Sequence, residues 1–160
     1  MTAFKTYRTA SGLPISATLA KAGERGFKSL GRALYREAIG IMAASQPLVP
    51  VDTAALRSSG YVAEPVYEGT HVRVELGYGG PAAKINPKTG QSTDGYALLV
   101  HENLEAFHKV GSAKYLELPF NQATSGMTAR LVDTMEADVA GAPTPNFAYG
   151  GLTELGQPET

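Results

Sequence analysis

The sequence predicts an α+β fold in which a long N-terminal helix and a C-terminal helix pack on a small antiparallel β-sheet, with an extended N-terminal arm and a C-terminal tail. Apolar residues recur every third or fourth position over residues 15–45 and 114–139, and every second position over residues 71–78. The chain has 160 residues, of which 43% are hydrophobic and 18% charged, as is typical of one globular domain with its own core. We expect that domain over residues 14–140.

Composition excludes several classes of site. The chain contains no cysteine, so it has no disulfide, no thiolate metal ligand and no cysteine nucleophile. Apolar runs are all shorter than the roughly 18 residues that a transmembrane helix needs, and the first eight residues lack the apolar stretch of a signal peptide. We therefore expect no membrane partner and no export signal.

The two ends of the chain are predicted to lie outside the domain. An extended arm is expected over residues 1–13 and a Gly/Pro-rich tail over residues 141–160, because neither segment has a hydrophobic period. Pro14 then opens the long helix. Glycines within this helix lower its intrinsic propensity by up to about 1 kcal/mol each, so the helix needs packing or a close neighbour at these positions. The glycines are Gly23, Gly26, Gly31 and Gly40.

Two prolines follow the long helix and are expected to end it near residue 45, since proline cannot continue the hydrogen-bond ladder. Asp52 or Thr53 is then predicted to cap a single helical turn that extends to Arg57. This turn is predicted to lead directly into the first β-strand.

The middle of the chain is predicted to hold the β-sheet and a long loop. Residues 61–67 and 71–78 are β-prone and separated by a short glycine-containing turn, which indicates an antiparallel hairpin. Residues 79–95 show no apolar period and are expected to form a flexible loop. The apolar run 96–102 is compatible with a strand or with one helical turn. The second helix is predicted over residues 114–139.

Charge is unevenly distributed along the chain. Residues 1–36 hold seven Lys or Arg and one acid, a net charge of +6, whereas the remainder holds seven bases and fourteen acids, a net charge of −7. This separation fits a basic surface for a polyanion, two opposite faces that meet between neighbouring copies, or solvated faces without a partner. The acidic end of the second helix opposes the helix dipole unless a cation from elsewhere meets it. The residues concerned are Arg25, Lys28, Arg32 and Arg36 in the first helix and Asp133, Glu136 and Asp138 in the second.

The residues give little support to catalysis. The three histidines are too scattered for a metal-ligand motif, and neither a phosphate-binding loop nor a serine-hydrolase motif is present. His101 and Glu102, with Tyr96 nearby, could form an acid/base group. The favoured interpretation is structural, with His101 hydrogen-bonded to a backbone group at a strand end. We expect no catalytic residue, no metal and no cofactor.

Four motifs, in order, resemble the small neck proteins of long-tailed bacteriophages, which include minor capsid, head-tail joining and tail-completion proteins. The motifs are PVDTAALRSSG at 50–60, VRVELG at 72–77, YALLVHE at 96–102 and AKYLE at 113–117. The resemblance covers residues 15–139. Ala54 departs from it, because this family usually has glycine there, and the turn is therefore expected to be regular helix in this chain. The positions that carry the resemblance are Asp52, Thr53, Leu56, Arg57, Tyr96, His101, Glu102, Tyr115 and Leu116.

The resemblance implies a structural virion protein without enzymatic activity. Such a protein forms a homo-oligomeric ring of six-fold symmetry at the head-tail junction, where it completes the tail and connects it to the DNA-filled capsid. Its partners would be other copies of itself, the head-side connector, tail-side proteins and the DNA in the lumen. It would reside in the neck of the virion, and in the host cytoplasm during assembly.

The charge pattern adds a hypothesis about this ring. The basic residues of the first helix would face either the acidic helix end of the next subunit or the DNA. The alternative function, from a different class, is a nucleic-acid-binding module that uses the same basic helix.

Several motif residues also have structural interpretations. Leu56, Tyr96, Val100 and Leu116 are expected in the core. Arg57 is expected to pair with a carboxylate such as Asp52 or Glu102, a contact that contributes little to stability if exposed.

Overall fold

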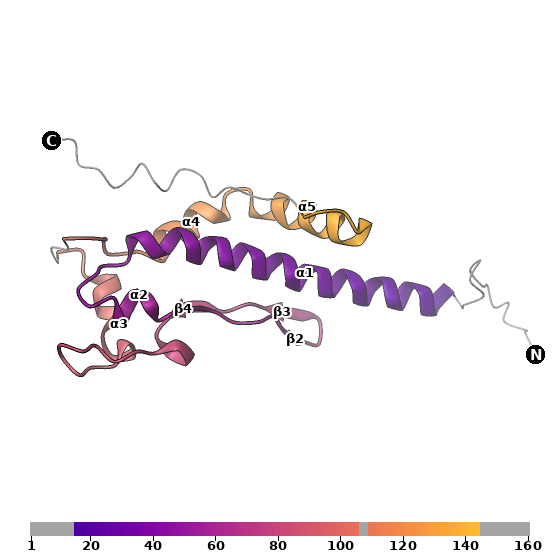
Figure 1. Ribbon diagram of the computed structural model, residues 1–160. Helices are drawn as coiled ribbons and strands as arrows, with labels where there is room; N and C mark the ends of the chain where they lie inside the picture. Colours follow the sequence, from indigo (N-terminus) through magenta and orange to yellow (C-terminus); the bar gives the residue numbers. More distant parts are fainter. Residues whose placement is uncertain (1–14, 106–108, 145–160) are drawn as a thin grey trace, which may run out of the picture.

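One long helix, α1 (Ile15–Ser45), organises the molecule. In the computed structural model the described residues are 15–105 and 109–144, with side chains from Ala20 onward. Every other described helix and strand lies alongside α1 or at its C-terminal end (Figure 1). The molecule is therefore mixed helix and strand, in agreement with the α+β prediction. The arm predicted over residues 1–13 and most of the predicted tail lie outside the described residues.

Two shorter helices pack along one side of α1: α4 (Glu117–Thr124) and α5 (Met127–Ala140) (Figure 1). The prediction of a single helix over residues 114–139 is wrong. The helix is interrupted at Gly126, which has a φ of +72°, a left-handed conformation that glycine adopts without steric cost. The chain changes direction there, and α5 returns along α1.

The other side of α1 carries a β-ribbon (Figure 1). The predicted antiparallel hairpin is confirmed, but it is divided into two short ladders, β1 with β4 and β2 with β3. Pro65 lies at the division, and proline has no amide to donate to a ladder. Tyr61 lies opposite Gly77 in the first ladder, and Tyr67 lies opposite Val72 in the second. The strands are β1 (Gly60–Val62), β2 (Val66–Glu68), β3 (His71–Arg73) and β4 (Leu76–Tyr78).

The predicted helical turn before the ribbon is present as α2 (Ala55–Ser58), but its cap differs from the prediction. The capping position is Ala54, and no side chain of the described residues caps the helix, so neither Asp52 nor Thr53 has the predicted role. Asp52 instead forms an ion pair with Lys88. Ala54 has a φ of +62°, so the expectation of regular helix at this position is also wrong. For a residue with a Cβ this conformation costs roughly 1–2 kcal/mol.

The segment predicted as a flexible loop over residues 79–95 is held by local hydrogen bonds. It contains the 3-10 helix η2 (Gly80–Ala82), and Ile85 and Ser92 form an isolated antiparallel bridge. Helix α3 (Thr93–Glu102) begins inside the predicted loop, because the Ser92 hydroxyl accepts a hydrogen bond from the backbone of the first turn. The apolar run 96–102 is therefore helical.

A buried cluster joins the 3-10 helix η1 (Gln46–Leu48), α2, α3 and the segment before α4. It confirms the predicted core: Leu56 is fully covered, and the half-buried side chains of Tyr96, Val100 and Leu116 pack against it. None of the described helices combines the length and the apolar character needed to cross a membrane. The buried members of the cluster are Val49, Leu56, Ala97 and Tyr115.

Candidate functional site

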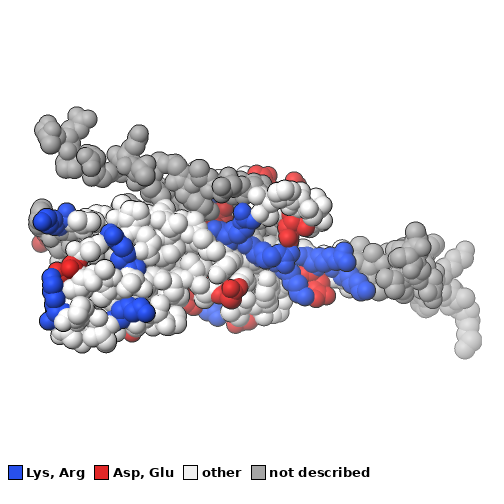
Figure 2. Space-filling view, viewed as in Figure 1, with Lys and Arg blue, Asp and Glu red and all other residues white. Residues whose placement is uncertain are grey.

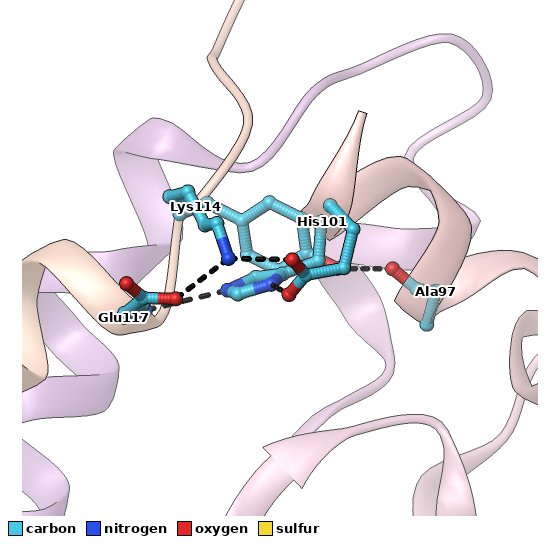
Figure 3. Close-up of polar contacts among 6 residues, drawn as sticks. Ala97, His101, Lys114 and Glu117 are labelled. Carbon is cyan, nitrogen blue, oxygen red and sulfur yellow. Dashed lines mark hydrogen bonds and ion pairs between the residues drawn. The ribbon is translucent and has the colours of Figure 1, made fainter. Parts of the chain in front are cut away.

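Three of the four sequence motifs meet around Tyr115. Its ring is 2% exposed and lies edge-on to the ring of Tyr78, with the centroids 5.1 Å apart. The Tyr115 hydroxyl donates a hydrogen bond of 2.9 Å to the carbonyl oxygen of Ala97 in α3 (Figure 3). Burial of this hydroxyl raises the pKa of Tyr115 well above its usual range. Tyr115 therefore fixes α3 to the segment that leads into α4.

A charged network lies beside this ring (Figure 3). The Lys114 ammonium lies between two carboxylates, with Nζ 2.5 Å from Oε2 of Glu102 and 2.8 Å from Oε2 of Glu117. Lys114 has a φ of +56°, a left-handed backbone conformation that is uncommon for a residue with a Cβ. The hydrogen bond from Lys114, and then that from His101, lower the pKa of Glu102, while the bonds to Glu102 and Glu117 raise the pKa of Lys114.

His101 uses both ring nitrogens within the fold. Its Nδ1 lies 2.8 Å from Oε1 of Glu102, and its Nε2 accepts a hydrogen bond of 3.3 Å from the backbone amide of Glu117. Since Nε2 accepts, Nδ1 carries the proton and donates it to the carboxylate. The His101 carbonyl also accepts from the Lys114 amide at 2.8 Å. The predicted bond between His101 and a backbone group is confirmed, but His101 lies in helix α3 and not at a strand end.

Sequence spacing did not indicate the grouping of His101, Glu102 and Glu117. Their potential ligand atoms lie within 4.8 Å of one another, although Glu117 comes from a different segment. Lys114 occupies the space between the two carboxylates and offsets one of their two negative charges. The arrangement is therefore a hydrogen-bonded ionic network that connects α3 to the start of α4. The only sequence signal for it was that Glu117 belongs to the AKYLE motif.

Tyr96 does not join this group. It lies five residues before His101 in α3, on a different face, and it lines an open cleft of about 410 Å³ together with Asp52, Thr53 and Leu56. His101 borders a separate, smaller hollow with Leu116. The acid/base group of His101, Glu102 and Tyr96 that the sequence offered is therefore not assembled as a unit.

Arg57 pairs with no carboxylate of the described residues, and neither Asp52 nor Glu102 is its partner, so that expectation is wrong. One Nη2–H of Arg57 donates a 3.1 Å hydrogen bond to the carbonyl of Val49, while Gln46 donates to the carbonyl of Arg57 at 3.2 Å. The two candidate partners, Asp52 and Glu102, are bound to lysines instead. Arg57 thus ties α2 to the segment that follows η1.

The basic side chains of α1 form a continuous blue band in Figure 2. Lys28 pairs with Glu24 at 2.8 Å on the same helix, and Arg32 pairs with Asp138 at the C-terminal end of α5. Arg32 is the cation that the acidic end of α5 was predicted to need, and it belongs to the same chain. Its hydrogen bond lowers the pKa of Asp138. The remaining residues proposed for contacts outside the chain, Arg25, Arg36, Asp133 and Glu136, are exposed.

The sequence interpretation missed the ion pair that attaches α5 to α1. The Glu37 side chain is 5% exposed and faces Arg130, with Nη2–Oε2 at 2.8 Å and Nε–Oε1 at 3.0 Å. Arg130 also donates to the carbonyls of Ala123 and Ser125, so it connects α5 to the C-terminal end of α4. The available signal was an acid next to Ala38 on the apolar side of the predicted helix.

Comparisons of the chain with protein-family models, with curated proteins and with solved structures gave no match. The functional interpretation therefore depends on the motifs and on the geometry of the described residues.

Proposed function

We propose that this chain is a structural subunit of a tailed bacteriophage that assembles into a ring at the head-tail junction and completes the tail or joins it to the head. The observation that carries the proposal is the N-terminal part of α1, which extends past every other described element (Figure 1). Ala20 and Gly23 continue the row of Phe27, Leu30 and Leu34 at helical spacing, yet both are exposed. We call residues 20–26 the overhang.

The overhang has the character of a contact surface for another chain. Apart from the adjoining residues and the backbone of α1 itself, no atom of the described residues lies within 4 Å of the position that a Cβ would occupy at Gly23 or Gly26. Gly23 and Gly26 lower the stability of the helix, and the described residues show no packing contact that would require them. A neighbouring subunit that approaches closely would supply the reason for both.

A second uncovered surface lies at the other end of the molecule. The outer face of α3 exposes Leu98 and Leu99, each 69% exposed, and Leu104 follows at 75%. Clustered exposed apolar residues mark interaction sites in soluble proteins. Figure 1 places α3 and the overhang at opposite ends of α1. A head-to-tail ring requires two different surfaces on opposite sides of each subunit, and these two surfaces have that placement.

The motif residues support this proposal in a structural role. Their polar groups bind one another or the backbone, as in the Lys114 network, and their apolar groups form the core. These contacts build a rigid end from which the apolar face of α3 is presented.

The test is the mass of the purified chain by native mass spectrometry and light scattering, with negative-stain images, at low and high salt. We expect closed rings for the natural sequence. Leu98→Ser/Leu99→Ser removes the α3 face, and Gly23→Gln obstructs the overhang, so neither variant alone should form rings. Ile85→Ser, at an exposed apolar residue elsewhere, is the matched control and should still form rings.

Mixing the two defective variants sharpens the test. Each retains one intact surface, so a single head-to-tail contact should form between them and give a 1:1 dimer that cannot close. Dimers of one variant alone would instead indicate that each surface binds its own copy. A natural chain that remains monomeric at all concentrations would contradict self-assembly into a ring.

A further inference from the structure

Five basic residues form one stripe along α1. They follow spacings of four, three, four and four residues, which keeps them on a single helix face, and all five are exposed. At 1.5 Å per residue the stripe is about 22 Å long. Figure 2 shows it as a continuous band between α5 and the β-ribbon that extends onto the overhang. The stripe consists of Lys21, Arg25, Lys28, Arg32 and Arg36.

The carboxylates that contact the stripe do not remove it from solvent. Lys28 remains 58% exposed in its pair with Glu24, and Arg32 remains 56% exposed in its pair with Asp138. Ion pairs this exposed contribute little and exchange readily for another anion. The stripe therefore keeps an excess of accessible positive charge on a straight, preformed helix.

The acidic end of α5 in a neighbouring copy is too short to match this stripe. Asp133, Glu136 and Asp138 lie within five residues of one another and span about 7.5 Å of helix, compared with about 22 Å for the stripe. Duplex DNA, by contrast, carries one negative charge for about every 1.7 Å of its axis and is straight over this length. The shape and the charge of the stripe both fit an extended polyanion.

We propose that the stripe on α1 binds the phosphate backbone of duplex DNA without reading its sequence. Lys and Arg contacts to phosphates position a protein on the duplex and carry no direct sequence information. The inference rests on the proposed function only in its choice of duplex DNA as the polyanion, and its test does not require rings.

The probe is a fluorescein-labelled duplex of about 24 base pairs and mixed sequence, titrated with the full chain by fluorescence anisotropy between 50 and 200 mM NaCl. If four or five phosphates are neutralised, affinity should fall on the order of 100-fold across this range. Lys21→Gln/Arg25→Gln changes a different face of α1 from Ala20 and Gly23, the row proposed to meet a neighbouring subunit, and both side chains are exposed. It should weaken binding at 50 mM at least tenfold and reduce the slope of log Kd against log salt by about two.

The matched control removes two exposed lysines elsewhere. Lys84→Gln/Lys109→Gln changes net charge equally and should leave the slope unchanged. Circular dichroism verifies the fold of both variants. Absence of binding at 50 mM, or equal weakening in the two variants, would overturn the proposal. Binding that depends strongly on the sequence of the duplex would overturn the claim of backbone recognition.

Ring mass, measured on the same variants, separates this inference from the proposed function. A Lys21→Gln/Arg25→Gln chain that forms rings but loses DNA affinity supports both. Loss of rings, with or without loss of DNA affinity, would assign the stripe to a subunit contact and overturn the DNA proposal. A natural chain that forms no rings, yet shows the expected pattern of DNA binding, would contradict the proposed function and leave the inference standing.

Discussion

The two halves of α1 have the same kind of sequence and opposite surroundings. From residue 29 to the C-terminal end of α1, every fourth residue is buried between the helix and its neighbours: Ser29, Ala33, Glu37, Ile41 and Ser45. In the N-terminal half, residues 20–25 are all exposed. A helical period shows which face of a helix can be buried, but it does not show whether the burying surface belongs to the same chain. The difference between the halves separates residues that maintain the fold from residues available to a partner.

The largest effect is expected from one substitution made in both halves. Glu37→Gln leaves the largely buried Arg130 guanidinium without its counter-charge and should lower the free energy of unfolding by about 3–5 kcal/mol. Glu24→Gln removes a carboxylate from the exposed N-terminal part of α1. Both Glu24 and its partner Lys28 are exposed there, so the urea midpoint should remain unchanged. Urea denaturation followed by circular dichroism measures both.

Small and similar losses of unfolding free energy in Glu37→Gln and Glu24→Gln would contradict the distinction between the buried C-terminal part of α1 and its exposed N-terminal part. Arg130→Met provides a second approach to the same contact. It should also be strongly destabilising, because it leaves Glu37 buried and releases the carbonyls of Ala123 and Ser125.

The next largest difference in unfolding free energy between the two parts of α1 is expected from glycine substitutions. A Cβ at Gly31 would lie 2.1 Å from the Tyr67 hydroxyl oxygen, whereas no described atom beyond the adjoining residues and the backbone of α1 lies within 4 Å of a Cβ at Gly23. Gly23→Ala should therefore raise the free energy of unfolding by about 0.5–1 kcal/mol through helix propensity. Gly31→Ala should give no such gain, because Tyr67 must leave its edge contact with Phe27 and its hydrogen bond to the Lys28 carbonyl.

A double-mutant cycle isolates the cause. In a Tyr67→Ala background Gly31→Ala should become as stabilising as Gly23→Ala, since the obstruction is gone. An unchanged effect of Gly31→Ala in that background would show that the ribbon does not explain this glycine. Gly23→Ala has a further use: a variant that is more stable yet forms fewer rings would identify Gly23 as an interface residue.

Sequence patterns predicted those parts of the fold that depend on periodicity. The bounds of α1, the antiparallel ribbon and the core positions of Leu56 and Leu116 follow from apolar spacing and are confirmed. Single-residue backbone conformations were not predictable in the same way. Gly126 interrupts a continuous helical period, and Ala54 takes a left-handed conformation although it has a Cβ. Apolar periodicity reports which face of an element is buried and carries no information on the φ of a single residue.

The candidate site was predictable only within segments. His101 and Glu102 are adjacent in the sequence, and their side chains are in contact. The approach of Lys114 and Glu117 to them depends on how α3 meets α4, which is fixed by the burial of Tyr115. The Glu37–Arg130 pair joins residues 93 positions apart. The sequence contains no local spacing pattern that would indicate a polar pair between residues so far apart.

The smallest effect is expected from pH, at the ion pair that links α5 to α1. The bond from Arg32 lowers the pKa of Asp138 below its ordinary value of 3.8. A carboxyl whose pKa is lower in the folded chain stabilises the fold above its unfolded pKa, and this contribution is lost as pH falls through the folded pKa. Acid should therefore weaken the attachment of α5, and Asp138→Asn should remove that part of the acid dependence.

Glu24, in the exposed N-terminal part of α1, provides the comparison for the titration of Asp138. The pKa of Glu24 is also lowered, by Lys28 four residues along the same helix, so its protonation loosens one helical turn and no contact between elements. Urea midpoints between neutral pH and pH 2.5 should thus depend on Asp138 more than on Glu24, with Asp133→Asn as a charge-matched control on α5. A Glu24→Gln chain that lost as much acid dependence as Asp138→Asn would mean that the overhang is packed in solution, which is the surface that ring formation is expected to cover.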